Sequence, residues 1–301
     1  MKFGGHQTFF IREGWLYKGL YLLNEKPELF DDKHLADYLG VGRNMAQSIV
    51  YWLQACGLAE RPLVDGRKRT GALFLTDFAK QVWKNDKYFV DEGTWWFIHI
   101  NLVNAKQHAT TWHWFFNNFP RDRFDRGECI EALVQWQATE NGRQQSPHTL
   151  ERDVAVLLLS YATHVPPLDK DPEEEIDCPL RDLGLINNYR HSGYFQLRKK
   201  KRDIPNQITM YALNKSLQDE IQAEGILEQK ILDIIRAPCS PTRIFLMSND
   251  DFYESLASIE NRTNSKWIEL RGLAGERMVR MELKTDPLFW IKDYYSKRNG
   301  A

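Results

Sequence analysis

The stretch from Lys33 to Val82 has the spacing of a helix-turn-helix, followed by a strand, a basic turn and a closing helix. A small residue, Ala36, stands where the first helix would cross the second, and Gly40 follows at the position of the sharp turn. Gly57 stands where a glycine commonly ends the second helix. This order of elements predicts a winged helix-turn-helix fold for the segment.

The second helix of this hairpin is predicted to present a polar face to solvent. Its outward side chains can donate to phosphates or read base edges, and they are Arg43, Asn44, Gln47, Ser48 and Tyr51. A recognition helix lies in the major groove of duplex DNA with its N-terminal residues nearest the bases. The sequence therefore predicts a double-stranded DNA-binding surface on this helix.

The residues after this helix add a second cationic element. A turn between two strands is predicted at the glycine-flanked cations Arg67, Lys68 and Arg69, whose charge would suit a phosphate backbone. Winged helices also serve as dimerisation or protein-docking modules, and helical hairpins with this Ala-Gly spacing occur in protein cores. The segment alone leaves these alternatives open.

Length and composition limit the remaining possibilities. The chain has 301 residues, of which 43% are hydrophobic, enough for two or three compact units with sizeable cores. Its formal net charge of -1 excludes a uniformly basic coat, so any DNA contact must come from local patches. The four cysteines are far apart, which indicates neither a disulfide framework nor a zinc site. No stretch is long enough to cross a bilayer, and we expect a cytoplasmic protein without a membrane partner.

The predicted fold class is α+β, mainly helical with small β-hairpins. Three regions are expected: an N-terminal segment with the winged helix-turn-helix over residues 1–86, a helical middle over 87–165, and an α+β region over 178–301. The boundary before the last region is placed at a proline-rich and acidic stretch. In the last region, a helix followed by two short strands and a glycine-rich turn at 272–275 predicts a second winged-helix-like unit.

The last region also contains a basic run and a stretch with helical spacing of apolar residues, and each leads to a prediction. The basic run Lys199, Lys200 and Lys201, flanked by arginines, is placed on a hairpin and is the strongest local positive charge in the chain. It would suit a phosphate backbone, although such runs are as often solvated loops. Apolar residues at helical spacing predict a helix over 221–235.

The N-terminal segment combines two glycines with polar residues that could act in catalysis. His6, Arg12 and Glu13 form either a polar cluster at a catalytic surface or a structured cap whose side chains bond to backbone carbonyls. A carboxylate-x-lysine ending occurs at Glu282 and Lys284, as in many metal-dependent nucleases, but no acidic partner is identifiable. No Walker-type phosphate loop is present, so the use of ATP is not indicated.

Several motifs in the same order carry a family resemblance. They read FGGHQTFFIREGWLYKG, LGVGRNMAQSIVYWLQACGL, DEGTWWFIHINLV and ATTWHWFFN. Together they resemble the domain-of-unknown-function 4007 family, whose members are similar to the SspB component of bacterial DNA phosphorothioation systems. The sequence departs from the family pattern at Gln7, where a glutamate is usual, which puts a metal-dependent site at this position in doubt.

The resemblance implies a DNA-nicking activity in defence against phage, with an ATPase, a sulfur-transfer enzyme and a cysteine desulfurase as partners. On this basis we expect the protein to nick one DNA strand so that sulfur can be incorporated, with His6, Arg12 and Glu13 as the first candidates for catalysis. A divalent metal ion, Mg or Mn, would suit such a reaction, although the sequence reveals no metal ligands. The alternative is a non-catalytic winged-helix adaptor or transcriptional repressor.

Overall fold

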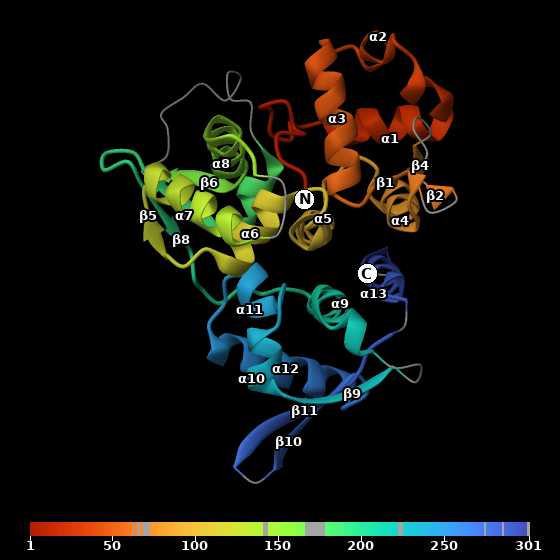
Figure 1. The fold of residues 1–301 in the computed structure, drawn as a ribbon. Coiled ribbons are helices and arrows are strands. Elements are labelled where there is room, and N and C mark those ends of the chain that lie inside the picture. Colours follow the sequence, from red (N-terminus) through yellow and green to blue (C-terminus); the bar gives the residue numbers. More distant parts are fainter. Residues whose placement is uncertain are drawn as a thin grey trace. The chain divides into compact units, whose positions relative to one another are not determined.

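The computed structural model describes residues 1–301 apart from 62, 65–66, 69–72, 141–143, 166–177, 222–224, 274, 285 and 300–301. The chain folds into two compact units, Met1–Arg198 and Lys199–Ala301 (Figure 1). Both units combine helices with small sheets, so the predicted α+β class is confirmed. The predicted regions 1–86 and 87–165 both lie in the first unit, and the third, 178–301, spans the division. No helix among the described residues has the length and apolar character to span a membrane.

The beginning of the first unit follows the order of elements expected from the sequence. Its elements are α1 (Trp15–Glu25), η1 (Pro27–Asp31), α2 (Leu35–Leu39), α3 (Arg43–Ala55), β1 (Ala59–Glu60), β2 (Leu63–Val64), β3 (Arg67–Lys68), β4 (Phe74–Leu75) and α4 (Asp77–Asn85). Strands β1 and β4 pair antiparallel, as do β2 and β3. Gly40 ends α2 with a φ of 64°, a conformation that glycine adopts without steric cost.

Helix α3 is anchored by a close crossing with α1. Gly19 of α1 is buried, and a Cβ atom at this position would lie 2.8 Å from Leu53 Cδ1 and 2.9 Å from Ile49 Cγ2. Because these distances are shorter than any ordinary carbon contact, only glycine allows the two helices to approach this closely. The sequence pattern places the small residue at Ala36 and does not indicate this second crossing.

A Gly19→Leu substitution is expected to lower the free energy of unfolding by about 1–3 kcal/mol, because an inserted side chain must push α1 away from α3. Urea denaturation followed by tryptophan fluorescence measures the change. The matched control is Asn24→Leu, which places the same side chain on an exposed position of the same helix. Equal stability of both variants would show that the crossing tolerates a side chain.

The rest of the first unit surrounds a buried helix. Its elements are α5 (Glu92–Asn104), α6 (Thr110–Asn118), β5 (Arg123–Phe124), α7 (Arg126–Thr139), α8 (Pro147–Tyr161), β6 (Ala162–Val165), η3 (Pro179–Leu183), β7 (Ile186–Tyr189) and β8 (Tyr194–Leu197). Helix α5 is buried over most of its length, as its apolar sequence predicts. The four-stranded sheet has the order β5-β8-β7-β6, in which only the β6–β7 pair is parallel (Figure 1).

The second unit places helices beside a three-stranded antiparallel sheet of order β10-β11-β9 (Figure 1). Its elements are α9 (Asn206–Ser216), η4 (Gln218–Glu220), β9 (Ile226–Lys230), α10 (Ile231–Arg236), α11 (Pro241–Ile244), α12 (Asn249–Thr263), β10 (Ile268–Leu273), β11 (Glu276–Glu282) and α13 (Leu288–Asn299). The buried indole of Trp290 on α13 donates to Asn214 Oδ1 on α9 at 2.8 Å. This bond fixes the last helix against the first one of the unit.

Two predictions for this part of the chain are wrong. Residues 221–235 do not form one helix, because Ile226–Lys230 are strand β9 and the helix that follows, α10, is Ile231–Arg236. Pairing with β11 decides the conformation of β9. The basic run at 199–201 is not on a hairpin: β8 ends at Leu197, and the run begins the second unit. Lys201 Nζ there forms an ion pair with Glu254 at 2.5 Å.

Candidate nucleic-acid interface and the buried network behind it

The beginning of helix α3 carries the side chains best placed to contact nucleic acid. Arg43, Asn44 and Gln47 are all exposed. The helix starts after the extended residue Gly42 without a side-chain cap, so its first amide groups carry the positive end of the helix dipole. One cationic and two amide side chains therefore project from the N-terminal turns of a helix that buries its opposite face. Contact of this edge with DNA stays a prediction.

The two remaining residues predicted on this face point into the protein. Ser48 is 0% exposed and Tyr51 only 4%. The Tyr51 ring packs edge-on against the ring of His6 at 5.8 Å, and burial raises the pKa of its hydroxyl. The assignment of Ser48 and Tyr51 to DNA contact is therefore wrong in this conformation. The N-terminal segment covers Tyr51, and the local helical pattern gives no indication of a contact with so distant a segment.

The cationic residues after α3 differ from the prediction in their local structure. Arg67 and Lys68 are not in a turn but form strand β3, which pairs with Leu63 and Val64. Arg69 lies outside the described residues. A contact of these three cations with a phosphate backbone stays a prediction, as does that of Lys199 and its neighbours.

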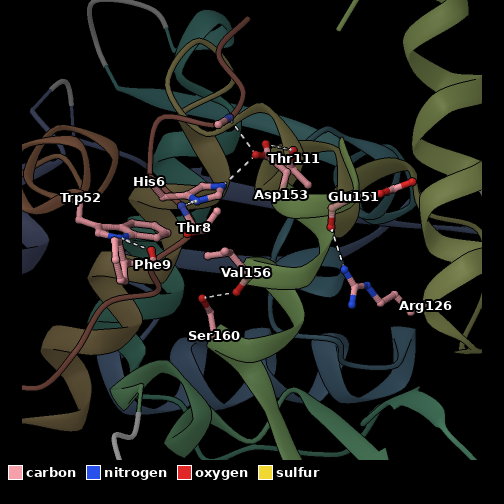
Figure 2. A network of polar contacts seen from close by, with 11 residues as sticks. His6, Thr8, Phe9, Trp52, Thr111, Arg126, Glu151, Asp153, Val156 and Ser160 are labelled. Atoms are coloured by element: carbon pink, nitrogen blue, oxygen red, sulfur yellow. Dashed lines mark hydrogen bonds and ion pairs between the residues drawn. The ribbon is translucent and has the colours of Figure 1, made fainter. Parts of the chain in front are cut away.

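His6 lies at the centre of a buried polar network (Figure 2). Its side chain is 1% exposed, and its Nε2 lies 2.8 Å from Asp153 Oδ1. The backbone N–H of Thr8 donates to His6 Nδ1 at 3.1 Å. Because Nδ1 accepts this bond, it carries no proton, and the proton on Nε2 is donated to Asp153. Both ring nitrogens are therefore engaged inside the protein.

The Asp153 carboxylate on α8 accepts hydrogen bonds from three donors in different parts of the chain. Its Oδ1 also accepts from the backbone N–H of Gly4 at 2.8 Å, and its Oδ2 accepts from Thr111 Oγ1 on α6 at 2.7 Å. On the other side of His6, Trp52 Nε1 of α3 donates to the carbonyl of Phe9 at 3.0 Å (Figure 2). The N-terminal segment is thus held between α3 and the middle helices.

This network was not found by reasoning from the sequence. Asp153 is the single acidic residue in the apolar part of its helix, DVAVLLL. A carboxylate in an otherwise buried stretch requires a hydrogen-bonded partner. That rule is the signal that could have found Asp153, although it would not have named His6 as the partner.

The other two predicted catalytic residues lie in a different environment from His6. Arg12 and Glu13 line an open pocket of about 510 Å³ in the first unit. The Arg12 guanidinium lies over the rings of Phe9 and Trp15, at 5.4 and 5.3 Å from their centres, and its Nε has no hydrogen-bond partner. Catalysis by His6, Arg12 and Glu13 stays a prediction, with His6 better suited to positioning the segment than to touching a substrate.

The described residues do not form a cage for a metal ion. No three His, Cys, Asp or Glu side chains among them are close enough to bind one together. Carboxylates of the kind that Mg²⁺ prefers do line the pocket, at Glu13, Glu92 and Asp182. One of them, Glu92, already accepts from Trp96 Nε1 at 3.2 Å. The Glu282 carboxylate of the nuclease-like ending is bound to Lys284, which lowers its pKa.

The cysteines do not suit a sulfur-carrying role. All four are buried, and they are Cys56, Cys129, Cys178 and Cys239. Burial raises the pKa of Cys129 to about 12 and that of Cys56 further. Because the thiolate is the nucleophile, these two groups are unreactive at neutral pH.

Comparison with solved structures shows the fold. The chain is similar to a structure described as "Magnesium ion-bound SspB crystal structure", with a TM-score of 0.84 and 22% identity over 99% of this chain and 87% of that one. A second, "SspB crystal structure", has a TM-score of 0.84 and 22% identity over 98% and 88%. No curated protein matches the chain. The family model described as "Protein of unknown function (DUF4007)" matches residues 3–295, so the chain belongs to the DUF4007 family.

Proposed function

We propose that the protein binds duplex DNA as a component of a bacterial DNA phosphorothioation system and nicks one strand so that sulfur can be incorporated. Family membership and the fold shared with SspB structures support the place in such a system. The observation that carries DNA binding is the exposed edge of α3, with Arg43, Asn44 and Gln47. The partners in this proposal are an ATPase, a sulfur-transfer enzyme and a cysteine desulfurase.

The order α1, α2, α3 and the β1–β4 pair supports a winged helix-turn-helix in the first 86 residues. In that fold, α3 enters the major groove and the hairpin of β2 and β3 lies near the backbone. Exposure of the α3 edge supports this orientation, because the opposite face of the helix packs on α1 and on the N-terminal segment.

The chemical part of the proposal rests on Arg12 and Glu13. Hydrolysis of a phosphodiester needs a group that removes a proton from water and a cation that stabilises the charge developing on the phosphate. In the pocket, Glu13 supplies an exposed carboxylate and Arg12 a half-buried guanidinium. His6 supports both by holding the preceding turn to Asp153.

The purified protein is expected to convert supercoiled plasmid to open circles in the presence of MgCl₂ or MnCl₂. Magnesium is tested because one related structure is described as magnesium-bound, and manganese because it prefers the same oxygen ligands. Glu13→Gln is expected to slow conversion about 100-fold or more, since a general base contributes about 10²–10⁴-fold. Glu25→Gln, an exposed position on α1, removes the same charge and is expected to act like the wild type.

The alternative function is a DNA-binding adaptor or repressor that does not cut. Burial of His6 with both nitrogens engaged favours it, because one predicted catalytic group is then closed off from a substrate. Plasmid that is bound but never opened, at any concentration of either metal, would support the adaptor and refute nicking. Equal conversion by wild type and Glu13→Gln would leave nicking in place and refute the role of Glu13.

A further inference from the structure

A cluster of partly exposed aromatic rings covers one surface of the first unit. Tyr17 of α1 stacks on Trp83 of α4, with ring centres 6.0 Å apart and planes 14° apart, and it contacts Tyr88 at 5.1 Å. Tyr21, one turn further along α1, lies 6.1 Å from Tyr17. Tyr21 is 50% exposed and Tyr88 60%. We call these four residues the aromatic platform; exposed apolar clusters of this kind mark binding surfaces.

The loop that carries Tyr88 is held rigidly in a strained conformation. The Asp86 carboxylate accepts from the backbone N–H of Val90 at 2.9 Å and from Thr94 Oγ1 at 2.6 Å. Phe89 has a φ of 58°, which is unusual for a bulky residue, and its carbonyl accepts from Trp95 Nε1 at 2.9 Å. Strain that the surrounding bonds maintain is commonly found at binding sites. The platform is therefore preorganised on the Tyr88 side.

The platform leads into the open pocket already described. Tyr17 and Tyr88 line this pocket of about 510 Å³ together with Phe89 and Trp95. The volume falls within the range of small-molecule sites, about 300–1,000 Å³. Rings on its walls provide flat apolar surfaces against which a planar ligand can stack.

The polar groups of the pocket narrow the chemistry of its ligand. Arg12 offers guanidinium hydrogen-bond donors, and Glu13 and Glu92 offer carboxylate acceptors. A planar ring with acceptors and donors on its edge satisfies both, and nucleobases have this pattern. A nucleotide bound in this way would place its base inside the pocket and its backbone at the opening of the pocket.

Cations for the backbone stand outside the pocket, on the elements that form the platform. Lys18 of α1, Lys84 of α4 and Lys87 are exposed, and Lys87 Nζ lies 4.9 Å from the centre of the Tyr88 ring. Aromatic rings interleaved with cations are how proteins bind unpaired nucleic-acid strands. We propose that the aromatic platform and its pocket bind a single-stranded nucleic acid, with one base in the pocket and the phosphates over these lysines. This surface is separate from the duplex-binding edge proposed on α3.

Fluorescence anisotropy with a labelled single-stranded DNA of about 12 nucleotides tests this proposal, since strands of this length cover typical single-strand sites. Tyr88→Ala and Tyr21→Ala are each expected to weaken binding about 5- to 150-fold, because stacking contributes about 1–3 kcal/mol per base. Tyr88→Phe keeps the ring and is expected to bind like the wild type. The control is Tyr38→Ala, which removes a tyrosine of α2 that is 53% exposed and lies outside the platform.

The duplex of the same sequence separates this proposal from the proposed function. Tyr88→Ala is expected to bind the duplex normally, whereas the Arg43→Ala/Asn44→Ala double variant is expected to bind the single strand normally. Unchanged single-strand affinity in both Tyr88→Ala and Tyr21→Ala, or no single-strand binding by the wild type, would overturn the proposal. Loss of self-association in Tyr88→Ala with unchanged strand affinity would assign the platform to a protein interface and overturn it as well.

Discussion

Replacing Asp153 by alanine is expected to lower the free energy of unfolding by about 3–5 kcal/mol, because the carboxylate accepts three hydrogen bonds in the network around His6. Asp153 is 1% exposed and accepts hydrogen bonds from His6, Gly4 and Thr111. Its removal leaves three donors without an acceptor, of which the His6 and Thr111 side chains are buried, and each unsatisfied buried group costs about 1–3 kcal/mol. Urea denaturation of the full chain, followed by tryptophan fluorescence, measures the loss.

Two variants make this test specific. Asp153→Asn keeps one carbonyl oxygen as an acceptor, so its loss of stability is expected to lie between those of the wild type and Asp153→Ala. Asp31→Ala removes an exposed aspartate of the same unit and is expected to change the free energy of unfolding by less than about 0.5 kcal/mol. A loss below about 1 kcal/mol for Asp153→Ala would show that the network does not hold the N-terminal segment in place.

The Arg43→Ala/Asn44→Ala double variant is expected to bind duplex DNA about 10- to 100-fold more weakly than the wild type. A good bidentate contact to a base contributes about 1–3 kcal/mol, and the arginine can also neutralise a phosphate. Both side chains are exposed, so their loss is not expected to disturb the packing of α3. Fluorescence anisotropy with a labelled duplex at fixed salt concentration measures the affinity.

The matched control for this binding test is Arg236→Ala, which removes an exposed arginine from helix α10 of the second unit. We expect it to bind the duplex like the wild type. Equal losses in Arg236→Ala and in the double variant would point to general attraction between the chain and DNA, without a recognition helix.

The parts of the fold that the sequence predicted correctly depend on local signals. Gly40 closes α2 at the predicted turn, because this signal acts within a few residues. Strand β9 was missed because residues 226–235 fit a helical period, while the strand that pairs with 226–230 begins at Glu276, about fifty residues later. Pairing between strands this far apart in the sequence does not change the spacing of apolar residues within either strand.

In the candidate site too, the sequence predicted the features that depend on local patterns and missed those that depend on contacts between distant residues. Exposure of Arg43, Asn44 and Gln47 follows from the polar stripe of one helix, and the sequence predicted it correctly. Tyr51 was misassigned because the segment that covers it comes from the beginning of the chain, and Ser48 was misassigned because it is buried. The His6–Asp153 bond joins residues 147 positions apart, so neither residue could identify the other.

The most direct test of duplex binding by the α3 edge is the dependence of affinity on salt concentration, measured for the wild type and Arg43→Ala on one labelled duplex. A phosphate contact at Arg43 predicts that the logarithm of the binding constant falls linearly with the logarithm of salt, and that Arg43→Ala makes the slope shallower by about 0.9. Identical affinities and identical salt slopes for the two proteins would contradict the assignment of α3 as the helix that binds DNA.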